Sequence, residues 1–314
     1  MPTLTPRVRA RLAVSRALRH VPATTAERLR RTAAGGGRSG RALRPALGLL
    51  RHRPLTDVSD FALSDNPQVR LMGTDSLLVR RLYWYGENGY EGQELQWWRH
   101  FCARSKRIVE MGANVGFYTV QAAVAAPTAK IVAVEAHPVS AEVTRQNLAL
   151  NGIESVTVVE AAVVGDATLK SVRLLLPDGE QYEAPTGAFV TGAEVADRPA
   201  GTHVDVPAVF APELVRGADL LKLDIEGLEA DVLEACAAAV AEARPVIFVE
   251  VIRSAFRLRA LIADWHERLG YVVFAIGTDS LHLVTKAQLS SKELLPRFGT
   301  RDVILVPQEK TATI

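Results

Sequence analysis

Residues 108–119 read IVEMGANVGFYT and join the end of an apolar strand to a turn of small residues. Glu110 stands where residues 108–109 end the strand, and from Phe117 the pattern predicts a helix to residue 126. Small residues let a ligand approach the backbone closely, and a helix N-terminus offers free N–H groups. We therefore expect an open α/β sheet with a nucleotide-like ligand at this turn. The turn consists of Gly112, Ala113, Asn114 and Gly116.

The spacing of the glycines separates two kinds of ligand. A dinucleotide fingerprint has the pattern G-x-G-x-x-G, whereas this turn reads Gly112-x-x-x-Gly116 with Glu110 before it. A carboxylate there repels phosphate and suits a cation, such as the methionine end of S-adenosylmethionine. The next predicted strand, residues 130–135, ends at Glu135, 23 positions after Gly112 (135 − 112). That is close to the roughly 20 residues at which an acid reaches ribose hydroxyls. The alternative is an ordinary glycine-rich turn without a ligand.

The composition is that of an ordinary soluble globular protein. The chain has 314 residues, of which 23% are charged and 48% hydrophobic. Cys102 and Cys236 form neither a disulfide framework nor a metal-ligand spacing, so we expect a reduced, cytoplasmic setting. No apolar run approaches the roughly 18 residues of a membrane helix. The seven histidines form no metal-ligand pair such as H-E-x-x-H, and we predict no metal site.

The first 56 residues are strongly basic. They hold thirteen arginines, no lysine and one acid, Glu27, so their net charge is about +12 against +2 for the whole chain. A basic segment can bind nucleic acid or an acidic surface. This one has no aromatic residue and no nucleic-acid motif, and it lacks the apolar core of a secretory signal. We interpret it as an amphipathic, partly flexible arm and expect no nucleic-acid partner.

The pattern divides the chain into three regions. Residues 1–56 form the arm, with helical spacing over 8–29 and 42–50, and residues 57–106 form a helical cap. Residues 107–314 alternate strands and helices, which indicates a doubly wound, mostly parallel sheet. Residues 161–166 are expected to form a loop. Alternation fails over 166–214, where short apolar runs predict an antiparallel, β-rich insertion. The core strands are predicted at 155–160, 220–224, 245–251, 271–275 and 302–306, a hairpin partner at 278–285, and helices at 91–103, 139–151, 228–242 and 254–269.

A second informative stretch is LLKLDIEGLE, residues 220–229. A central strand of a parallel sheet is covered on both faces and is expected to be apolar throughout, yet Lys222 and Asp224 interrupt this one. Burying them unpaired costs several kcal/mol, so they are paired or lie at the open carboxyl end of the strand. Glu226 follows in the loop, and Glu250 ends the neighbouring predicted strand. Ligands bind outside the carboxyl ends of such strands, so these acids converge with Glu110 and Glu135 on one rim. A structural ion pair of Lys222 with one acid is the alternative.

Five segments together resemble one known family. The chain is similar to the FkbM family of S-adenosylmethionine-dependent methyltransferases over residues 90–251, and its most specific part is K-x-D-x-E-G-x-E from Lys222 to Glu229. Glu110 stands where the family more often has aspartate, and neither the arm nor the insertion matches a family motif. The segments are VEMGANVGFYT, VEAHP, NLALNG, LLKLDIEGLEADVL and VIFVEV.

The resemblance implies the seven-stranded class I methyltransferase fold and a methyl transfer, most often to a hydroxyl of a secondary metabolite or sugar. Glu110 would hold the amino group of S-adenosylmethionine and Glu135 both ribose hydroxyls. Asp224, Glu226 and Glu250, with Lys222 beside them, would serve the acceptor. The remaining cofactor-binding residues would be Gly112, Asn114, Gly116, Phe117, His137 and, beside the adenine, Ala162.

Two other functions are compatible with the residues. A nicotinamide-dependent oxidoreductase is disfavoured by the missing third glycine of G-x-G-x-x-G. A non-catalytic binding protein on the same fold would use the basic arm as its working surface. The partner expected of the enzyme is a small hydroxylated molecule, and no membrane span is expected.

Overall fold

The structure is a computed structural model that describes residues 18, 20–34, 48, 50, 52–177, 189–190, 201–252, 254–277, 280–290 and 301–314. The chain divides into two compact units, the first ending at Gly92 and the larger one running from Gln93 to Ile314. The predicted helix at 42–50 and much of that at 8–29 fall outside the described residues. Of the latter, residues 23–29 belong to the helix α2, Ala23–Ala34.

The described part of the N-terminal unit contains the helices α2 and α4 and a short hairpin. Strands β1 (Asp60–Ala62) and β2 (Arg70–Met72) pair antiparallel. Helix α4 (Leu77–Tyr85) follows, then the 3-10 turn η1 (Gly86–Gly89). Ser76 is the N-cap of α4, with an extended backbone, while Asp75 before it forms an ion pair with Arg80.

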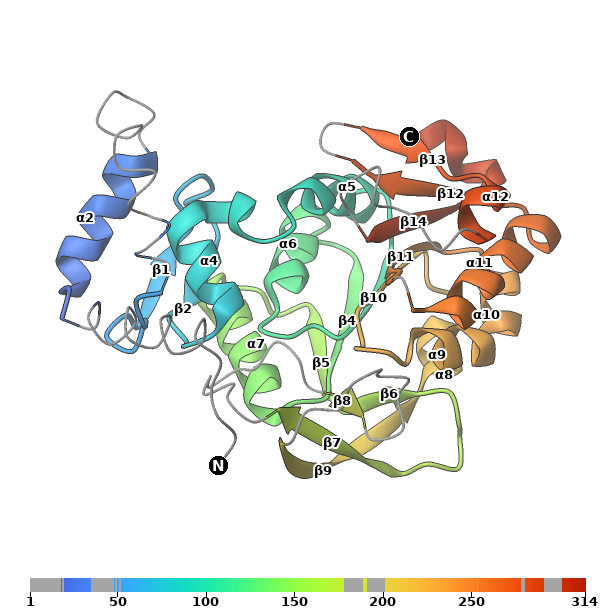
Figure 1. Cartoon of the computed structure of the whole chain (residues 1–314), viewed down its shortest axis with the longest axis horizontal. Helices are drawn as coiled ribbons and strands as arrows, with labels where there is room; N and C mark the ends of the chain where they lie inside the picture. Colours follow the sequence, from blue (N-terminus) through green and yellow to red (C-terminus); the bar gives the residue numbers. More distant parts are fainter. Residues whose placement is uncertain are drawn as a thin grey trace. The chain divides into compact units, whose positions relative to one another are not determined.

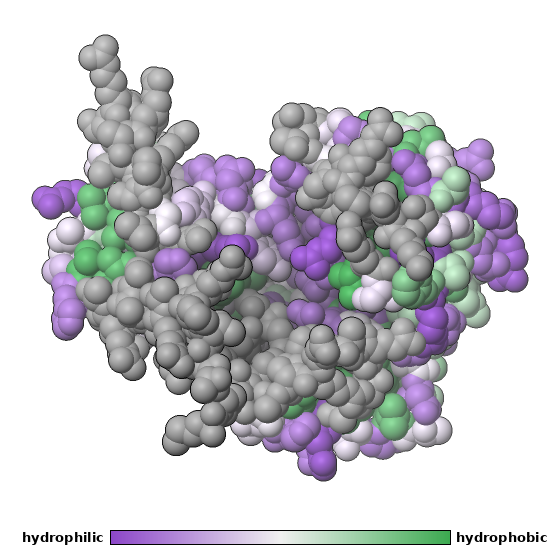
Figure 2. All heavy atoms as spheres, viewed as in Figure 1, coloured by the Kyte–Doolittle hydropathy of each residue, from purple (hydrophilic) through white to green (hydrophobic). Residues whose placement is uncertain are grey.

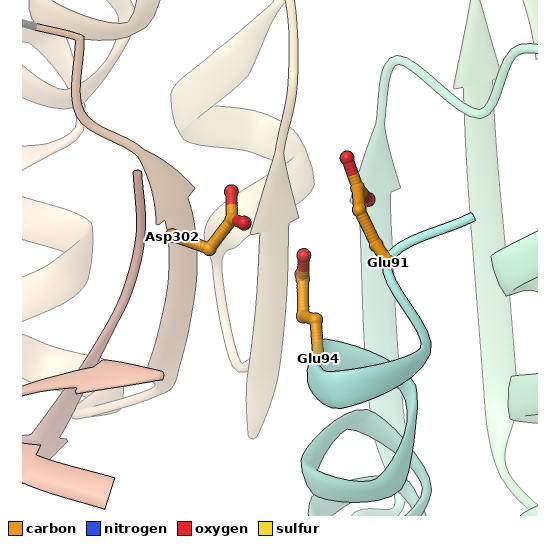
Figure 3. A group of neighbouring side chains, drawn as sticks. All are labelled: Glu91, Glu94 and Asp302. Carbon is orange, nitrogen blue, oxygen red and sulfur yellow. The ribbon is translucent and has the colours of Figure 1, made fainter. Parts of the chain in front are cut away.

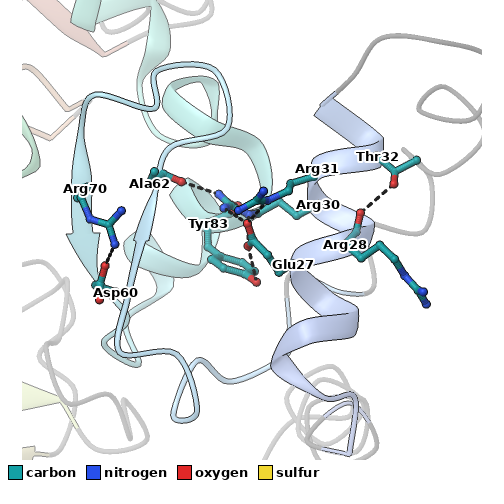
Figure 4. A network of polar contacts seen from close by, with 9 residues as sticks. All are labelled: Glu27, Arg28, Arg30, Arg31, Thr32, Asp60, Ala62, Arg70 and Tyr83. Atoms are coloured by element: carbon teal, nitrogen blue, oxygen red, sulfur yellow. Dashed lines mark hydrogen bonds and ion pairs between the residues drawn. The ribbon is translucent and has the colours of Figure 1, made fainter.

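Arg30 of α2 is buried inside this unit and is a structural charge. Only 4% of it is exposed, and its guanidinium carbon lies 4.6 Å from the centroid of the Tyr83 ring. It donates to both carboxylate oxygens of Glu27 and to the carbonyl oxygens of Ala62 and Tyr83 (Figure 4). A buried guanidinium is tolerated when several acceptors receive its fixed fork of N–H groups. Part of the positive charge of the arm therefore holds the fold together.

The larger unit is built on an eight-stranded sheet in the order β13-β12-β14-β11-β10-β3-β4-β5. The five strands from β11 to β5 are parallel, and β14 runs antiparallel to both of its neighbours. Removing the edge strand β13 leaves seven, so the predicted doubly wound class I methyltransferase fold is confirmed. The strands are β3 (Arg107–Met111), β4 (Lys130–Glu135), β5 (Val156–Glu160), β10 (Leu220–Leu223), β11 (Val246–Glu250), β12 (Tyr271–Ile276), β13 (Leu281–Leu283) and β14 (Asp302–Pro307).

Helices cover both faces of this sheet (Figure 1). On one face lie α5 (Gly92–Cys102), α6 (Phe117–Ala125) and α7 (Pro138–Leu150). Trp98 and Phe101 of α5 pack on Phe248 of β11, as core residues. The other face carries the main apolar cluster, in which side chains of β10 and β11 meet the remaining helices. These are α8 (Ala211–Val215), α9 (Glu229–Ala235), α10 (Ala237–Ala243), α11 (Phe256–Arg268) and α12 (Lys286–Ser290), with the 3-10 turn η2 (Gln308–Thr313) near the chain end.

Three local predictions are corrected by the structure. The expected loop at 161–166 contains a strand, β6 (Ala162–Val164), which pairs in parallel with β9 (Gly201–Phe210). The run AVV was too short to show a period. The insertion sheet has the order β6-β9-β7-β8, so it is mixed rather than purely antiparallel. The single helix expected at 228–242 is divided at Cys236, whose φ of −81° and ψ of 0° lie off the helical values. The other two strands are β7 (Ser171–Pro177) and β8 (Phe189–Val190).

The described surface is mostly hydrophilic on the face drawn in Figure 2, including the side where α10 and α11 lie. The large hydrophobic residues that are exposed are scattered over different elements, such as Phe256 on α11 and Val139 on α7. None of the described helices has the length and apolarity that crossing a membrane requires.

We expect Arg30→Met to destabilise the N-terminal unit by about 1–3 kcal/mol, because the carbonyl oxygens of Ala62 and Tyr83 lose this donor and Glu27 loses one of its two arginine partners. Hydrogen exchange of peptides covering β1, β2 and α4 measures this local opening. Arg31→Met is the matched control, since Arg31 also pairs with Glu27 but its side chain is 78% exposed. Equal protection in wild type and Arg30→Met would contradict the structural role of this charge.

Candidate functional site

The turn after β3 is tightly fixed by backbone contacts. The N–H groups of Gly112 and Ala113 both donate to the Val134 carbonyl of β4, at 2.9 and 3.0 Å. Gly112 has a φ of +89°, and a Cβ there would lie 1.8 Å from the Asp224 carbonyl oxygen. Glycine is therefore required because the chain after β10 passes directly against the turn. We predicted that the ligand needs this space; in the structure, the backbone of Asp224 occupies it.

Asn114 follows in the left-handed conformation, with a φ of +51°. Its N–H donates to Oε2 of Glu135 at 2.7 Å, and its carbonyl accepts the Thr144 hydroxyl at 2.8 Å. In the described part of the chain, no hydrogen-bond donor reaches the buried side-chain oxygen of Asn114. Gly116 closes the turn at a φ of +74° and packs against Thr144. The turn therefore presents one buried acceptor that the protein itself leaves unsatisfied.

Glu135 ends β4 and is 8% exposed. Oε1 accepts the N–H of His137 at 2.8 Å, and Oε2 accepts the N–H of Asn114. A carboxylate offers about four acceptor positions, so acceptor capacity remains on both oxygens. Burial raises the pKa of Glu135 to about 6, while these backbone N–H groups lower it. The side chain is thus held in one orientation beside the turn.

Glu110 lies within β3 and is almost completely buried, with 2% exposed. Its Oε2 accepts the hydroxyl of Thr119, on α6, at 2.6 Å. Burial raises the pKa of Glu110 to about 7, whereas the Thr119 hydrogen bond and the charge of Lys222 lower it. The carboxyl is therefore poised between its two protonation states near neutral pH.

The other three residues predicted to bind the cofactor take mainly structural positions. His137 is the N-cap of α7, where Nδ1 accepts the N–H of Ser140 at 3.3 Å, and burial lowers its pKa. Phe117 is 1% exposed and packs edge-on against Tyr118. Ala162 is buried in β6, one residue after the N–H of Ala161 donates to the Glu135 carbonyl. Phe117 directly follows the turn, and His137 lies two residues after Glu135. Ala162 follows Ala161, which contacts Glu135.

Lys222 lies in the middle of the sheet and is 6% exposed. Its ammonium is 3.4 Å from Oε1 of Glu94, 3.9 Å from Oδ2 of Asp224 and 4.5 Å from the centroid of the Tyr118 ring. In the sheet it stands directly beside Glu110 of β3. The predicted ion pair therefore exists, and the buried Lys222 ammonium interacts with more than one acid. Glu94 and Asp224 are its ion-pair partners, and Glu110 stands beside it in the sheet.

Glu250 ends β11, and 32% of its side chain is exposed. Burial, and next the charge of Asp224, raise its pKa to about 7, while Arg301 at 3.2 Å lowers it. The structure thus brings Glu250 and Asp224 into electrostatic contact. Glu226 is half-buried in the loop, where its φ of +53° is unusual for a non-glycine residue.

Sequence reasoning missed three acids near this rim. Glu229 accepts N–H groups of Ile225 and Gly227 and so fixes the loop after β10. The carboxylates of Glu94 and Asp302 lie within 4.8 Å of each other and reach the rim from α5 and β14 (Figure 3). A buried lysine in a central strand signals that a buried acid faces it, but the sequence does not say that Glu94 on another element is that acid.

A family model described as the methyltransferase FkbM domain matches residues 110–273, more than half of the chain. The chain belongs to the FkbM methyltransferase family. Methyltransferase sdnD of Sordaria araneosa is 29% identical over 152 residues, which are 40% of this chain and 59% of that protein. The match therefore spans less than two thirds of that relative.

Comparison with solved structures finds similar chains at low sequence identity. Cofactor-bound Rv0187 from MTB is 16% identical, with 69% of this chain and 81% of that chain covered and a TM-score of 0.39. Methyltransferase FkbM from Methylobacillus flagellatus KT is 12% identical, with 85% and 60% covered and a TM-score of 0.38. The O-methyltransferase from Bacillus cereus in complex with SAH is 15% identical, with 68% and 79% covered and a TM-score of 0.38.

The cofactor of this FkbM methyltransferase domain is S-adenosylmethionine. The residues at the turn fit that group. The unsatisfied Asn114 oxygen and the Glu110 carboxyl suit an ammonium group, which only donates hydrogen bonds. The free acceptor capacity of Glu135 suits two ribose hydroxyls.

We expect Glu135→Ala to weaken S-adenosylmethionine binding by about 1–3 kcal/mol, because ribose hydroxyls and two backbone N–H groups lose their acceptor. Calorimetric titration of the purified variant measures this. Glu160→Ala is the matched control: Glu160 stands beside Glu135 in the sheet but pairs with Arg145. Unchanged affinity in Glu135→Ala would show that the ribose lies elsewhere. Gly112→Val is a poor test, because a Cβ at this position overlaps the Asp224 backbone.

Proposed function

We propose that the protein is an S-adenosylmethionine-dependent methyltransferase that methylates a hydroxyl group of a small molecule. The observation that carries this proposal is the pair of acids at the carboxyl ends of β10 and β11. The Asp224 backbone touches the cofactor turn at Gly112, and Glu250 on the next strand has a pKa of about 7. A base of that pKa is suited to take a proton at neutral pH.

A hydroxyl acceptor explains why a base is needed there. An alcohol oxygen attacks readily only as its proton moves to another group, and general-base catalysis contributes typically 10²–10⁴-fold. Glu250 is partly exposed, so its carboxylate can reach a bound acceptor, and Asp224 raises its proton affinity. We assign Glu250 as the base and Asp224 as the group that tunes it and orients the hydroxyl.

The protein's other residues act by positioning. S-adenosylmethionine, when bound, supplies the methyl group on a sulfonium. Glu110 and Asn114 would hold its amino end, and Glu135 would hold its ribose. Lys222 is held by Glu94 and the Tyr118 ring and partly neutralises the acids around it. Such positioning is worth several kcal/mol when the reacting atoms are held in line. No step of this mechanism uses a metal.

The acceptor class follows from the family. We propose a hydroxylated secondary metabolite or a sugar as acceptor, as the resemblance implies. We also propose the cytoplasm as the compartment, because Cys102 and Cys236 are free and buried, as expected of a protein in a reducing setting. Titration with S-adenosylmethionine, followed by transfer of its labelled methyl group to a panel of hydroxylated small molecules, tests the proposal. A protein that binds NADH and not S-adenosylmethionine would overturn it.

We expect Glu250→Gln and Asp224→Asn each to lower methyl transfer at least about 100-fold, the scale of losing a general base. Cofactor affinity changes much less, since neither side chain is assigned to the cofactor. Glu226→Gln, measured in parallel, shows whether the third acid takes part. The matched control is Asp231→Asn, whose side chain is 43% exposed and pairs with Arg257. Full activity in EDTA is expected. Loss in EDTA that Mg²⁺ restores would instead show a metal mechanism.

The pH profile gives an independent check on the base. At saturating S-adenosylmethionine, kcat/KM for the acceptor should fall as pH drops below about 7, because Glu250 becomes protonated. Asp224→Asn should move this fall to lower pH, since it removes the negative charge that raises the pKa of Glu250. A profile that keeps its midpoint in Asp224→Asn would assign the titration to another group.

A further inference from the structure

We propose that Thr119 is a positioning residue for the cofactor: its hydroxyl holds the Glu110 carboxyl in the ionised form that accepts the cationic end of S-adenosylmethionine. The inference rests on the proposed function in one respect, namely that Glu110 faces that cation. It adds a residue outside the glycine turn to the binding machinery. It also couples cofactor binding to the release of a proton.

The geometry of this contact is specific. Thr119 is the third residue of α6, and Glu110 is the fourth of the five residues of β3, so the strand–turn–helix unit returns the hydroxyl onto the carboxyl. The distance from Oγ1 to Oε2 is 2.6 Å, and Thr119 and Glu110 are 0% and 2% exposed. A hydroxyl–oxygen distance of 2.5–2.7 Å is typical of a hydrogen bond to an ionised carboxylate.

The groups around Glu110 oppose one another. Lys222 on β10 favours the charged carboxylate, whereas Asp224 beyond β10 and Glu135 on β4 disfavour it. Cys102 of α5 also lies close enough for its pKa to be raised by Glu110. Burial is the largest effect and favours the neutral acid, so the Thr119 hydrogen bond acts against it. The hydroxyl is thus one of two groups that keep the carboxyl available as an anion.

Proton release follows from this balance. With a pKa of about 7, part of the Glu110 population carries a proton near neutral pH in the cofactor-free protein. A cation binds the ionised form, so the protonated fraction must lose its proton on binding. Affinity therefore rises with pH through about 7, up to about pH 8, where the α-amino group of the cofactor begins to lose its own proton. Without the Thr119 hydroxyl the pKa of Glu110 is higher, and the rise moves to higher pH.

The experiment is calorimetric titration with S-adenosylmethionine from pH 5.5 to 8 in buffers of different ionisation enthalpy, which also counts the protons released. We expect Thr119→Val to raise the midpoint by about one pH unit, so that affinity falls about tenfold at pH 6.5 and much less at pH 8. Thr119→Ser should restore the wild-type profile. If Thr119→Val does not fold, Thr119→Ala takes its place.

Two further variants make the test specific. Thr144→Val removes another buried hydroxyl near the turn, but that hydroxyl donates to the carbonyl oxygens of Asn114 and Ser140. It should lower affinity equally at every pH. In a Glu110→Gln background, Thr119→Val should leave the pH profile unchanged. In the cofactor-free protein, isotope-edited infrared titration of the Glu110 carboxyl should show a higher pKa in Thr119→Val.

Three outcomes decide the matter. A wild-type protein that fails to bind S-adenosylmethionine refutes the proposed function, whereas the infrared titration still tests the Thr119–Glu110 contact. Normal binding with the same midpoint in wild type and Thr119→Val overturns the inference alone. A midpoint shift in Thr144→Val as large as in Thr119→Val also overturns it, because the effect would then come from the turn as a whole.

Discussion

The contact between Gly112 and the carbonyl of Asp224 is the constraint on which the site depends. It leaves no room for a side chain, and it presses the chain leaving β10 onto the turn that leaves β3. The residues that we assign to the cofactor and those that we assign to the acceptor are therefore neighbours through backbone atoms, whatever their side chains are. Methyl transfer requires this arrangement, because donor and acceptor must be held in line at short range.

The buried carboxyl groups of the site also affect the stability of the folded protein. Burial raises the pKa values of Glu110 and Glu250 to about 7 and that of Glu135 to about 6, from an ordinary 4.5. The folded state then holds more protons than the unfolded chain between pH 4.5 and about 7, so these groups lose their stabilising contribution as pH rises through that window. On the assignment proposed above, cofactor binding favours the ionised forms of Glu110 and Glu135 and offsets part of the loss. The buried acids thus make the cofactor-free protein less stable at neutral pH, at the site that we assign to the cationic cofactor.

The sequence predicts the sheet well because its central strands are mostly apolar on both faces. Glu135 and Glu250 could be placed at strand ends from the sequence alone, and the hairpin partner of β12 from its spacing, whereas Glu110, expected at a strand end, lies one residue inside β3. Partners on other elements could not be placed: nothing local shows that Glu94 faces Lys222, or that Thr119 returns to Glu110. Arg30 is similar, since only the fold shows that it is buried while Arg31 beside it is exposed. Strand β6 and the break at Cys236 escape prediction because each depends on a few residues.

The order of strands in the sheet also affects how the chain folds during its synthesis. The pair at the centre of the sheet, β3 with β10, joins segments more than a hundred residues apart, and Asp219 fastens it by accepting the N–H groups of Lys106 and Arg107. Such non-local pairing has a high contact order and forms slowly. During synthesis β3, β4 and β5 emerge long before β10. The edge of β3 that pairs with β10 therefore stays unpaired until β10 has left the ribosome. The nascent chain therefore carries an unpaired, apolar strand edge for that interval, which is the hazard that chaperones relieve.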